Sequence, residues 1–280
     1  MSHWSLDDIS WQLFDRSKAR PELIAMVKAA CMVEHNGHDY ARYLCEVFHD
    51  DSEFCAVARE WAVEEVQHGQ SLRKWAELAD PAFNFDKSFK MFTEGYRLPQ
   101  NVVTSVRGSR SGELIARCIV ETGTSSYYTA IKDYTDEPVL QTICAHIAAD
   151  ELRHYKLFYT HLKRYQNKEK LDVLKRFAIA LGRISESEDD ELAYAFFAAH
   201  RNGIAGDYQR KACTDRYFAC ACLLYQKHHI EKMTSMVFKA IGLKPHTWLN
   251  RLFTRFAWSA MRLKQISLRP HSQRAMQGAW

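Results

Sequence analysis

Residues 64–69 read Glu-Glu-Val-Gln-His-Gly, and residues 147–154 read Ile-Ala-Ala-Asp-Glu-Leu-Arg-His. Each stretch contains one Glu-x-x-His motif, formed by Glu65 and His68 in the first and by Glu151 and His154 in the second. Both lie in long segments with helical periodicity, where residues three positions apart share a face of the helix. Each motif therefore predicts a carboxylate and an imidazole that point in the same direction, one turn apart.

Two further glutamates precede the motifs at matching distances. Glu34 lies 31 residues before Glu65, and Glu121 lies 30 residues before Glu151. In two antiparallel helical hairpins, such separations bring all four carboxylates to the same depth. One Glu from each of two helices, with Glu-x-x-His from the other two, is the ligand arrangement of di-iron and di-manganese carboxylate bundles. The predicted metal ligands are Glu34, Glu65, His68, Glu121, Glu151 and His154.

The charge of these residues explains why a metal is expected. Four carboxylates facing a helical core cannot all stay ionised without compensation, and two divalent cations would balance them. Carboxylate and imidazole ligands favour two iron ions, with manganese as the alternative at one or both positions. A third Glu-x-x-His, Glu46 with His49, has no matched partner and adjoins the polar turn 50–52, so we interpret it as surface.

The rest of the pattern predicts an all-α protein. Helices are expected at 21–49, 52–79, 111–134 and 138–165, and later at 169–184, 189–201, 209–241 and 246–264. The connection 81–110 has room for a short helix near 86–95. Two hairpins joined by one long crossover have the connectivity of ferritin-like four-helix bundles. We therefore expect an N-terminal segment at 1–20, the di-iron bundle at 21–166, and a C-terminal helical extension at 167–280 that packs on the bundle.

Composition and charge bound the class of protein. The chain has 280 residues, 47% of them hydrophobic and 26% charged, which excludes a disordered chain. The eight cysteines include no CxxC pair, and residues 1–8 do not resemble a secretory signal, so a cytoplasmic protein with reduced thiols is expected. From Asp207 onward, thirteen lysines and arginines face three acidic residues.

This basic C-terminal region leaves several partners open. The segment 246–264 alternates aromatic and basic residues and could contact an anionic membrane surface, an acidic carrier protein, the protein's own bundle or a second copy in a homodimer. No RNA-binding signature is present, which argues against nucleic acid. The basic Gly/Ser segment 105–112 could hold a phosphate at a helix N-terminus or form an ordinary helix cap.

The motifs also resemble a known family. Residues 147–154 resemble the I-A-A-D-E-x-R-H signature of the soluble acyl-carrier-protein desaturases, and residues 64–69 resemble their E-E-x-R-H-G signature with Gln67 in place of arginine. Glu121 and Thr124 match the family's E-x-x-T. The resemblance covers about residues 20–165.

The resemblance implies how the residues would act. Glu34 and His68 would bind one iron, Glu121 and His154 the other, and Glu65 and Glu151 would bridge them. Thr124 would lie on the oxygen-binding side and supply protons, unless its hydroxyl bonds only to its own helix. Asp150 would orient a ligand histidine or pair with Arg153. The implied activity is oxygen-dependent oxidation, desaturation or hydroxylation, of an apolar and fatty-acyl substrate.

Several alternatives remain open at this point. No flavin, nicotinamide or iron–sulfur motif is present, so a ferredoxin-like external donor would supply electrons. A ferritin-like iron-handling protein (a ferroxidase, an iron store or a peroxide scavenger), an aldehyde-deformylating type of oxygenase, and a metal-free scaffold are the other hypotheses. Gly37 either opens space for substrate or marks a close helix contact. Trp61 and Tyr128 line a tunnel, carry electrons or pack in the core.

Overall fold

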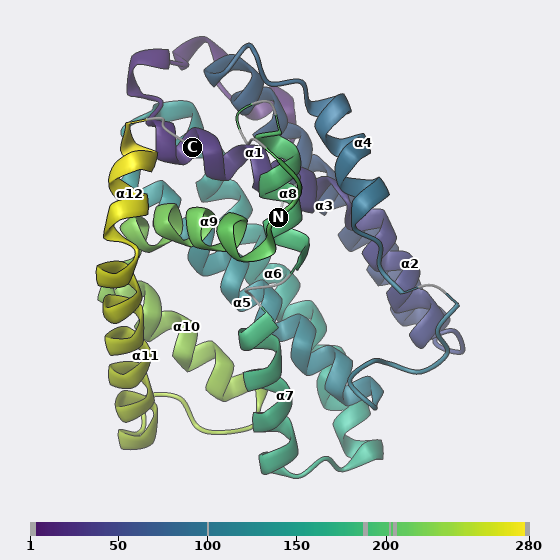
Figure 1. Ribbon diagram of the computed structural model, residues 1–280. Coiled ribbons are helices and arrows are strands. Elements are labelled where there is room, and N and C mark those ends of the chain that lie inside the picture. Colours follow the sequence, from purple (N-terminus) through teal and green to yellow (C-terminus); the bar gives the residue numbers. More distant parts are fainter. Residues whose placement is uncertain (1–3, 100, 187–189, 202, 204–205, 278–280) are drawn as a thin grey trace.

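The computed structural model describes residues 4–99, 101–186, 190–201, 203 and 206–277, and within these residues the protein is all-α with no strand (Figure 1). Three short 3₁₀ turns lie between Leu6 and Lys18. The first six helices are α1 (Pro21–His35), α2 (Gly37–Val47), α3 (Ser52–Ala79), α4 (Phe85–Gly95), α5 (Arg110–Tyr134) and α6 (Pro138–Glu169). The later helices are α7 (Val173–Ser185), α8 (Asp190–Ala199), α9 (Arg210–Leu224), α10 (Lys227–Ala240), α11 (Trp248–Ser267) and α12 (Arg269–Met276).

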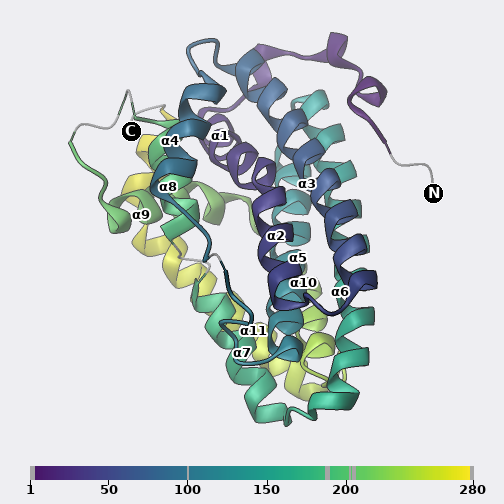
Figure 2. The same cartoon turned by 90° about the vertical axis from the view of Figure 1, so that its right-hand side faces the viewer.

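Two antiparallel helical pairs form the centre of the molecule. In Figure 2, α1 and α2 run down one side and α3 returns beside them, while α5 and α6 form the second pair. The connection from α3 to α5 includes α4 and descends along the outside, so that α3 and α5 point the same way. Arg110, at the start of α5, reaches the Asp50 carboxylate just before α3, which holds the two pairs in register.

Local capping explains where these helices begin. The Asp51 side chain accepts a hydrogen bond from the Phe54 amide (3.0 Å) at the start of α3, and Pro138 occupies the first turn of α6. The cap of α5 is Ser109, whose hydroxyl accepts a hydrogen bond from the Gly112 amide (3.0 Å). The Glu169 carboxylate accepts hydrogen bonds from the next two amides (3.1 and 2.7 Å). These amides are therefore already occupied, and the 105–112 segment is an ordinary cap.

Two expected helices are each divided in the structure. The helix expected at 21–49 breaks at Asn36 into α1 and α2, and the one expected at 209–241 breaks at Tyr225 into α9 and α10. The first break coincides with Gly37, where the chain passes so close to α3 that a Cβ would lie 2.6 Å from the Glu65 Cβ. The second follows from packing, because α9 contacts α1, α8 and α12 whereas α10 lies along α5. The last expected helix extends to Ser267, and α12 was not expected.

The apolar core is split into two clusters along the bundle. One includes Leu23, Trp75 and Ile143, and the other includes Phe54, Ile115 and Phe158. Each helical pair runs from one cluster to the other, and Glu34, Glu65, Glu121 and Glu151 all lie at the crossing point. A polar layer therefore separates two apolar halves, as the matched spacing of the four glutamates predicted.

The C-terminal helices cover the outside of this bundle. α8 packs on α1 and α4, α9 contacts α1 and α5, and α7 and α10 both lie against α5. All eight cysteines are free, and seven of them are buried, with Cys45 the half-buried one. Among the described residues, no helix has the length and apolarity that a membrane span requires.

Candidate metal centre

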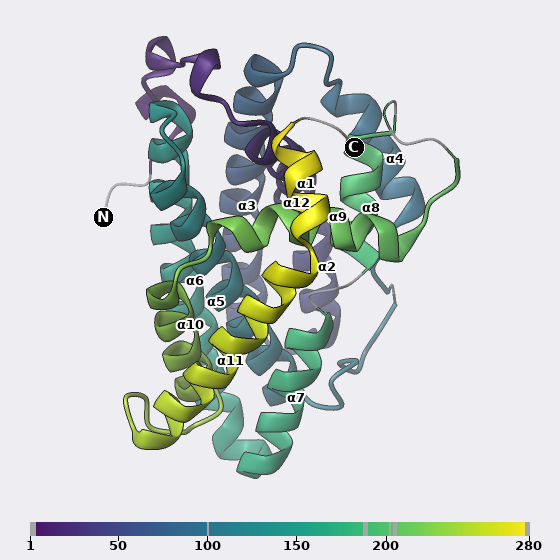
Figure 3. The ribbon, with the colours of Figure 1, turned by 60° about the vertical axis from the view of Figure 1, so that its left-hand side comes forward.

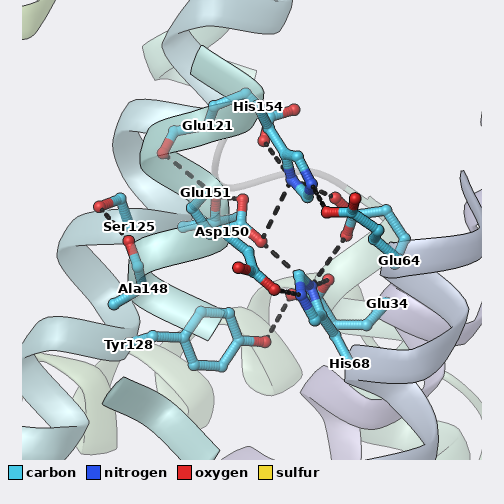
Figure 4. A network of polar contacts seen from close by, with 12 residues as sticks. Glu34, Glu64, His68, Glu121, Ser125, Tyr128, Ala148, Asp150, Glu151 and His154 are labelled. Atoms are coloured by element: carbon cyan, nitrogen blue, oxygen red, sulfur yellow. Dashed lines mark hydrogen bonds and ion pairs between the residues drawn. The ribbon is translucent and has the colours of Figure 1, made fainter. Parts of the chain in front are cut away.

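Six buried side chains from four helices meet in the polar layer (Figure 4). α1 contributes Glu34, α3 contributes Glu65 and His68, α5 contributes Glu121, and α6 contributes Glu151 and His154. The most exposed of the six, Glu34, retains 7% of its accessible surface, and His68 retains none. The structure thus brings together all six residues of the expected ligand set and shields them from water.

The six residues divide into two overlapping groups. Ligand atoms of Glu34, Glu65, His68 and Glu151 lie within 4.8 Å of one another, and so do ligand atoms of Glu65, Glu121, Glu151 and His154. Both groups therefore share Glu65 and Glu151, one from each Glu-x-x-His motif. This is the geometry in which two glutamates could bridge a pair of cations, each completed by one glutamate and one histidine.

Both imidazoles present the same nitrogen to this centre. The Nδ1 atom of His68 lies 3.3 Å from a Glu151 oxygen, and the Nδ1 atom of His154 lies 3.0 Å from a Glu65 oxygen. Each histidine therefore faces the glutamate of the opposite motif. The two rings are 5.8 Å apart between centroids, so they approach the centre side by side.

The outer nitrogens of the two histidines each meet a carboxylate. The Nε2 atom of His68 lies 3.0 Å from Asp150 Oδ2, and that of His154 lies 2.8 Å from Glu64 Oε2. A proton held on Nε2 leaves the Nδ1 lone pair directed inward, as a metal ligand requires. Asp150 was a candidate for this role, whereas Glu64 was missed. The signal for Glu64 was available, since an acidic residue directly precedes the glutamate of each motif.

Further contacts hold these outer carboxylates in place. The indole N–H of Trp4 donates to Asp150 Oδ2 (2.7 Å), and its ring stacks on His68 at 6.1 Å and on His146 at 4.9 Å. Arg153 pairs with both Asp150 and Glu64. Asp150 therefore contacts a ligand histidine and also pairs with Arg153, so both interpretations of this residue hold. The N-terminal segment is therefore part of the site through Trp4, a contact that sequence spacing could not indicate.

Unpartnered polar atoms test whether a cation fits this centre. Six buried atoms that face it have no hydrogen-bond partner among the residues that the structure describes: Glu65 Oε1, His68 Nδ1, both Glu121 oxygens, Glu151 Oε1 and His154 Nδ1. Buried polar atoms are nearly always satisfied, and each exception costs about 1–3 kcal/mol or more when charged. Lone pairs of oxygen and imidazole nitrogen directed at a common point form a donor set that suits iron or manganese. The residues present fit a pair of such cations.

The pKa values of the buried glutamates also indicate that positive charge is missing from this centre. Burial and the charge of Glu65 raise the pKa of Glu34 to about 8, and burial with the charge of Glu151 raises the pKa of Glu121 well above its usual range. Burial also opposes ionisation of Glu65, but the imidazoles of His154 and His68 that face it hold its pKa well below the usual value. The buried carboxylates repel one another when ionised, and bound cations would remove this repulsion.

Two hydroxyl groups contact the glutamates of the centre. Thr124 donates to Glu151 Oε2 (2.5 Å) and also lies 3.2 Å from the Val120 carbonyl of its own helix. Tyr128 is buried and donates to Glu34 Oε1 (2.5 Å). Trp61 is also buried and packs against Phe158. Thr124 is thus within reach of the centre while keeping its helix contact.

Other sequence candidates lie away from the centre. At Gly37 the close approach of the Glu65 Cβ shows that this glycine marks a tight helix contact and does not open space for substrate. His49 is exposed and lies outside the ligand groups, as expected for an unmatched motif. Two grooves at the surface, of 710 and 180 Å³, are lined by none of the six residues.

A third group of metal-binding residue types lies at the surface. Asp133, His228 and His229 approach one another beside α10, and the Nε2 atom of His229 lies 3.0 Å from Asp133. The Nδ1 atom of His229, however, accepts a hydrogen bond from the Gln226 amide (3.0 Å). The ring proton must then sit on Nε2, which donates to Asp133 and cannot bind a metal. His229 therefore helps to cap the start of α10.

Comparison with known proteins returns no family: no protein-family model matches this chain, and no curated protein matches it.

Proposed function

We propose that the protein is an oxygen-dependent, non-haem di-iron oxidoreductase built on a ferritin-like bundle, and that it acts on an apolar, fatty-acyl type of substrate. One observation carries the proposal. Six inward-facing ligand residues from four helices form two groups that share Glu65 and Glu151. The substrate class follows from the resemblance of residues 64–69 and 147–154 to the acyl-carrier-protein desaturases.

In this proposal Glu34 and His68 hold one iron, Glu121 and His154 hold the second, and Glu65 and Glu151 bridge them. A bound pair of ferrous ions would supply the electrons that reduce dioxygen and the oxidising power to remove hydrogen from a C–H bond. Manganese at one or both positions is the alternative that this donor set also accepts. Turnover requires an external, ferredoxin-like electron donor.

The protein's own residues then have three tasks. Asp150 and Glu64 keep the two imidazoles in the ligating orientation through their Nε2 atoms. The two apolar clusters exclude water above and below the polar layer. The Thr124 hydroxyl, which donates to Glu151, can hold or pass a proton at the edge of the centre.

Metal content tests the proposal first. Elemental analysis of protein produced with ample iron should find about two irons per chain. The Glu151→Ala variant should lose both metals and all iron-dependent oxygen consumption with reductant, whereas Glu46→Ala, in the unmatched motif, should retain them. Full retention of metal in Glu151→Ala would refute the site. Stoichiometric iron without substrate oxidation, in a cage-sized assembly, would instead show an iron-storage protein.

A further inference from the structure

Helix α11 packs on the protein by a mixed face and leaves most of its large apolar side chains outside. On the inward side Asn250 and Thr254 are buried, and Gln265 donates to the Cys222 carbonyl. Thr254 bonds the Thr234 hydroxyl of α10 at 2.6 Å, and Asn250 accepts from Ser235 at 3.2 Å. The inward apolar contacts include the Phe253 ring, which packs on Phe238 at 5.6 Å between centroids.

The outward face consists of large apolar side chains at helical spacing. Their exposed fractions are 72% for Trp248, 40% for Leu252, 68% for Phe256, 68% for Leu263 and 50% for Ile266. These positions recur every three, four or seven residues, so they share one side of the helix. Figure 3 shows α11 along the outside of the molecule for its whole length. Single exposed apolar residues are ordinary on a protein surface, whereas a continuous row of this size marks a contact surface.

A second helix extends this surface. The Phe253 ring of α11 meets the Phe177 ring of α7, with centroids 6.2 Å apart. On α7, Leu174 is 80% exposed and Leu181 is 39% exposed. Phe177 lies one turn from each of these leucines. The contact between Phe253 and Phe177 thus places α7, with its two exposed leucines, next to α11.

The charge around this row has a single sign. From Lys232 to the C-terminus the sequence contains nine lysines and arginines and no aspartate or glutamate. Arg251, Arg255 and Arg262 of α11 are all exposed, and they lie along one edge of the apolar row. Bulky apolar side chains with arginines beside them are the pattern of helices that lie in the interface of an anionic membrane.

We propose that α11 and the adjoining leucines of α7 bind the surface of an anionic lipid bilayer, with α11 parallel to the membrane plane. A second copy of the chain is a poorer occupant, because a symmetric contact through α11 would oppose arginine rows without an acidic partner on that helix. The inference is independent of the metal centre and of its substrate.

Vesicle sedimentation tests this inference directly. The full-length protein should bind vesicles of phosphatidylcholine with one-third phosphatidylglycerol, and it should bind pure phosphatidylcholine vesicles at least tenfold more weakly. Phe256→Glu should abolish binding, and Arg255→Glu should weaken it by roughly fivefold or more. Val103→Glu, at an apolar residue that is 73% exposed in the connection before α5, is the matched control and should bind normally. Both apolar sites are exposed, so circular dichroism should show unchanged helix content.

Trp248 supplies a second readout. The difference between the emission of the natural chain and that of Trp248→Phe should shift to shorter wavelength when anionic vesicles are added, because the indole leaves water. Absence of vesicle binding by the natural chain, or equal binding by Phe256→Glu and Val103→Glu, would overturn the inference. Sedimentation equilibrium that shows a dimer abolished by Phe256→Glu, without vesicle binding, would also overturn it and assign the face to self-association.

Discussion

The Glu64 carboxylate on α3 lies 2.8 Å from the Nε2 atom of His154 on α6, the mirror image of the contact between Asp150 on α6 and His68 on α3. Each acid directly precedes the glutamate of one Glu-x-x-His motif and supports the histidine of the other. The two motifs are therefore interlocked, and neither helix can shift along its axis without disturbing both imidazoles. Because Glu64 and Asp150 contact only the outer nitrogens of the histidines, they can be substituted without removing any of the six ligand residues.

Glu64→Gln should weaken metal binding by about 10- to 100-fold, because an amide orients the His154 ring less well than a carboxylate does. Calorimetric titration of metal-free protein with Fe²⁺ under anaerobic conditions, or with Mn²⁺, measures the change. The control is Glu46→Gln, the same substitution in the unmatched Glu-x-x-His motif, which should leave the metal affinity unchanged. Equal affinities for the two variants would show that Glu64 does not support the site.

A second prediction concerns the sign of a stability change. Burial and the charge of Glu151 raise the pKa of Glu121, so folding opposes its ionisation, and the uncharged Glu121→Gln should stabilise the metal-free protein by about 1–3 kcal/mol. The same substitution should reduce the rise in melting temperature that metal produces. Glu137 is equally buried, but it accepts hydrogen bonds from Trp75 and from the first amides of α6. Glu137→Gln should therefore destabilise the protein with or without metal. Urea unfolding measures both variants, and a change of free energy of unfolding in the same direction for both would contradict this reasoning.

The tight contact at Gly37 makes a third prediction. A methyl group there would lie 2.6 Å from the Glu65 Cβ, so Gly37→Ala should force α2 away from α3 and destabilise the protein by about 1–3 kcal/mol. Gly123, inside α5, has open space around it, and Gly123→Ala should stabilise by about 0.5–1 kcal/mol. Chemical denaturation separates the two. A Gly37→Ala protein as stable as the natural one would show that the helices can move apart at no cost.

A fourth prediction concerns acid stability. Burial lowers the pKa of His200 to about 4, from about 6.5 in an exposed histidine. Between these values the unfolded chain binds a proton that the folded protein excludes, so stability falls as the pH drops from about 6.5 to about 4, by about 3 kcal/mol for this group. His200→Gln should flatten that part of the stability profile, and His49→Gln, at the surface, should not. Unfolding measured across this pH range would show parallel profiles if His200 plays no part.

Sequence periodicity predicted the features that depend on local order. The two helical pairs, the crossover and the meeting of Glu34, Glu65, Glu121 and Glu151 at one depth follow from spacing within each hairpin. The two helix breaks were missed for different reasons. Asn36-Gly37 is a dipeptide typical of turns, so the first break had a local signal in the sequence. The second break, at Tyr225, follows from the different neighbours of α9 and α10.

Contacts between distant segments were beyond the reach of spacing. Trp4 donates to Asp150, which lies 146 residues further along the chain. The N-terminal segment that carries Trp4 has no α-helix and no motif that could have indicated this contact. The orientation of α11 was equally hidden, because an amphipathic pattern shows two faces without saying which one turns toward the protein. The burial of Asn250 and Thr254, with the exposure of Trp248 and Phe256, shows which side turns outward.

The polar layer between the two apolar clusters has a consequence for cooperativity. Each cluster draws side chains from both helical pairs, so each could stay folded as a unit while the layer between them loosens. Filling that layer with cations would join the two units, and emptying it would let them melt at separate temperatures. A calorimetric scan should then show one unfolding transition when cations fill the polar layer and two when they are removed.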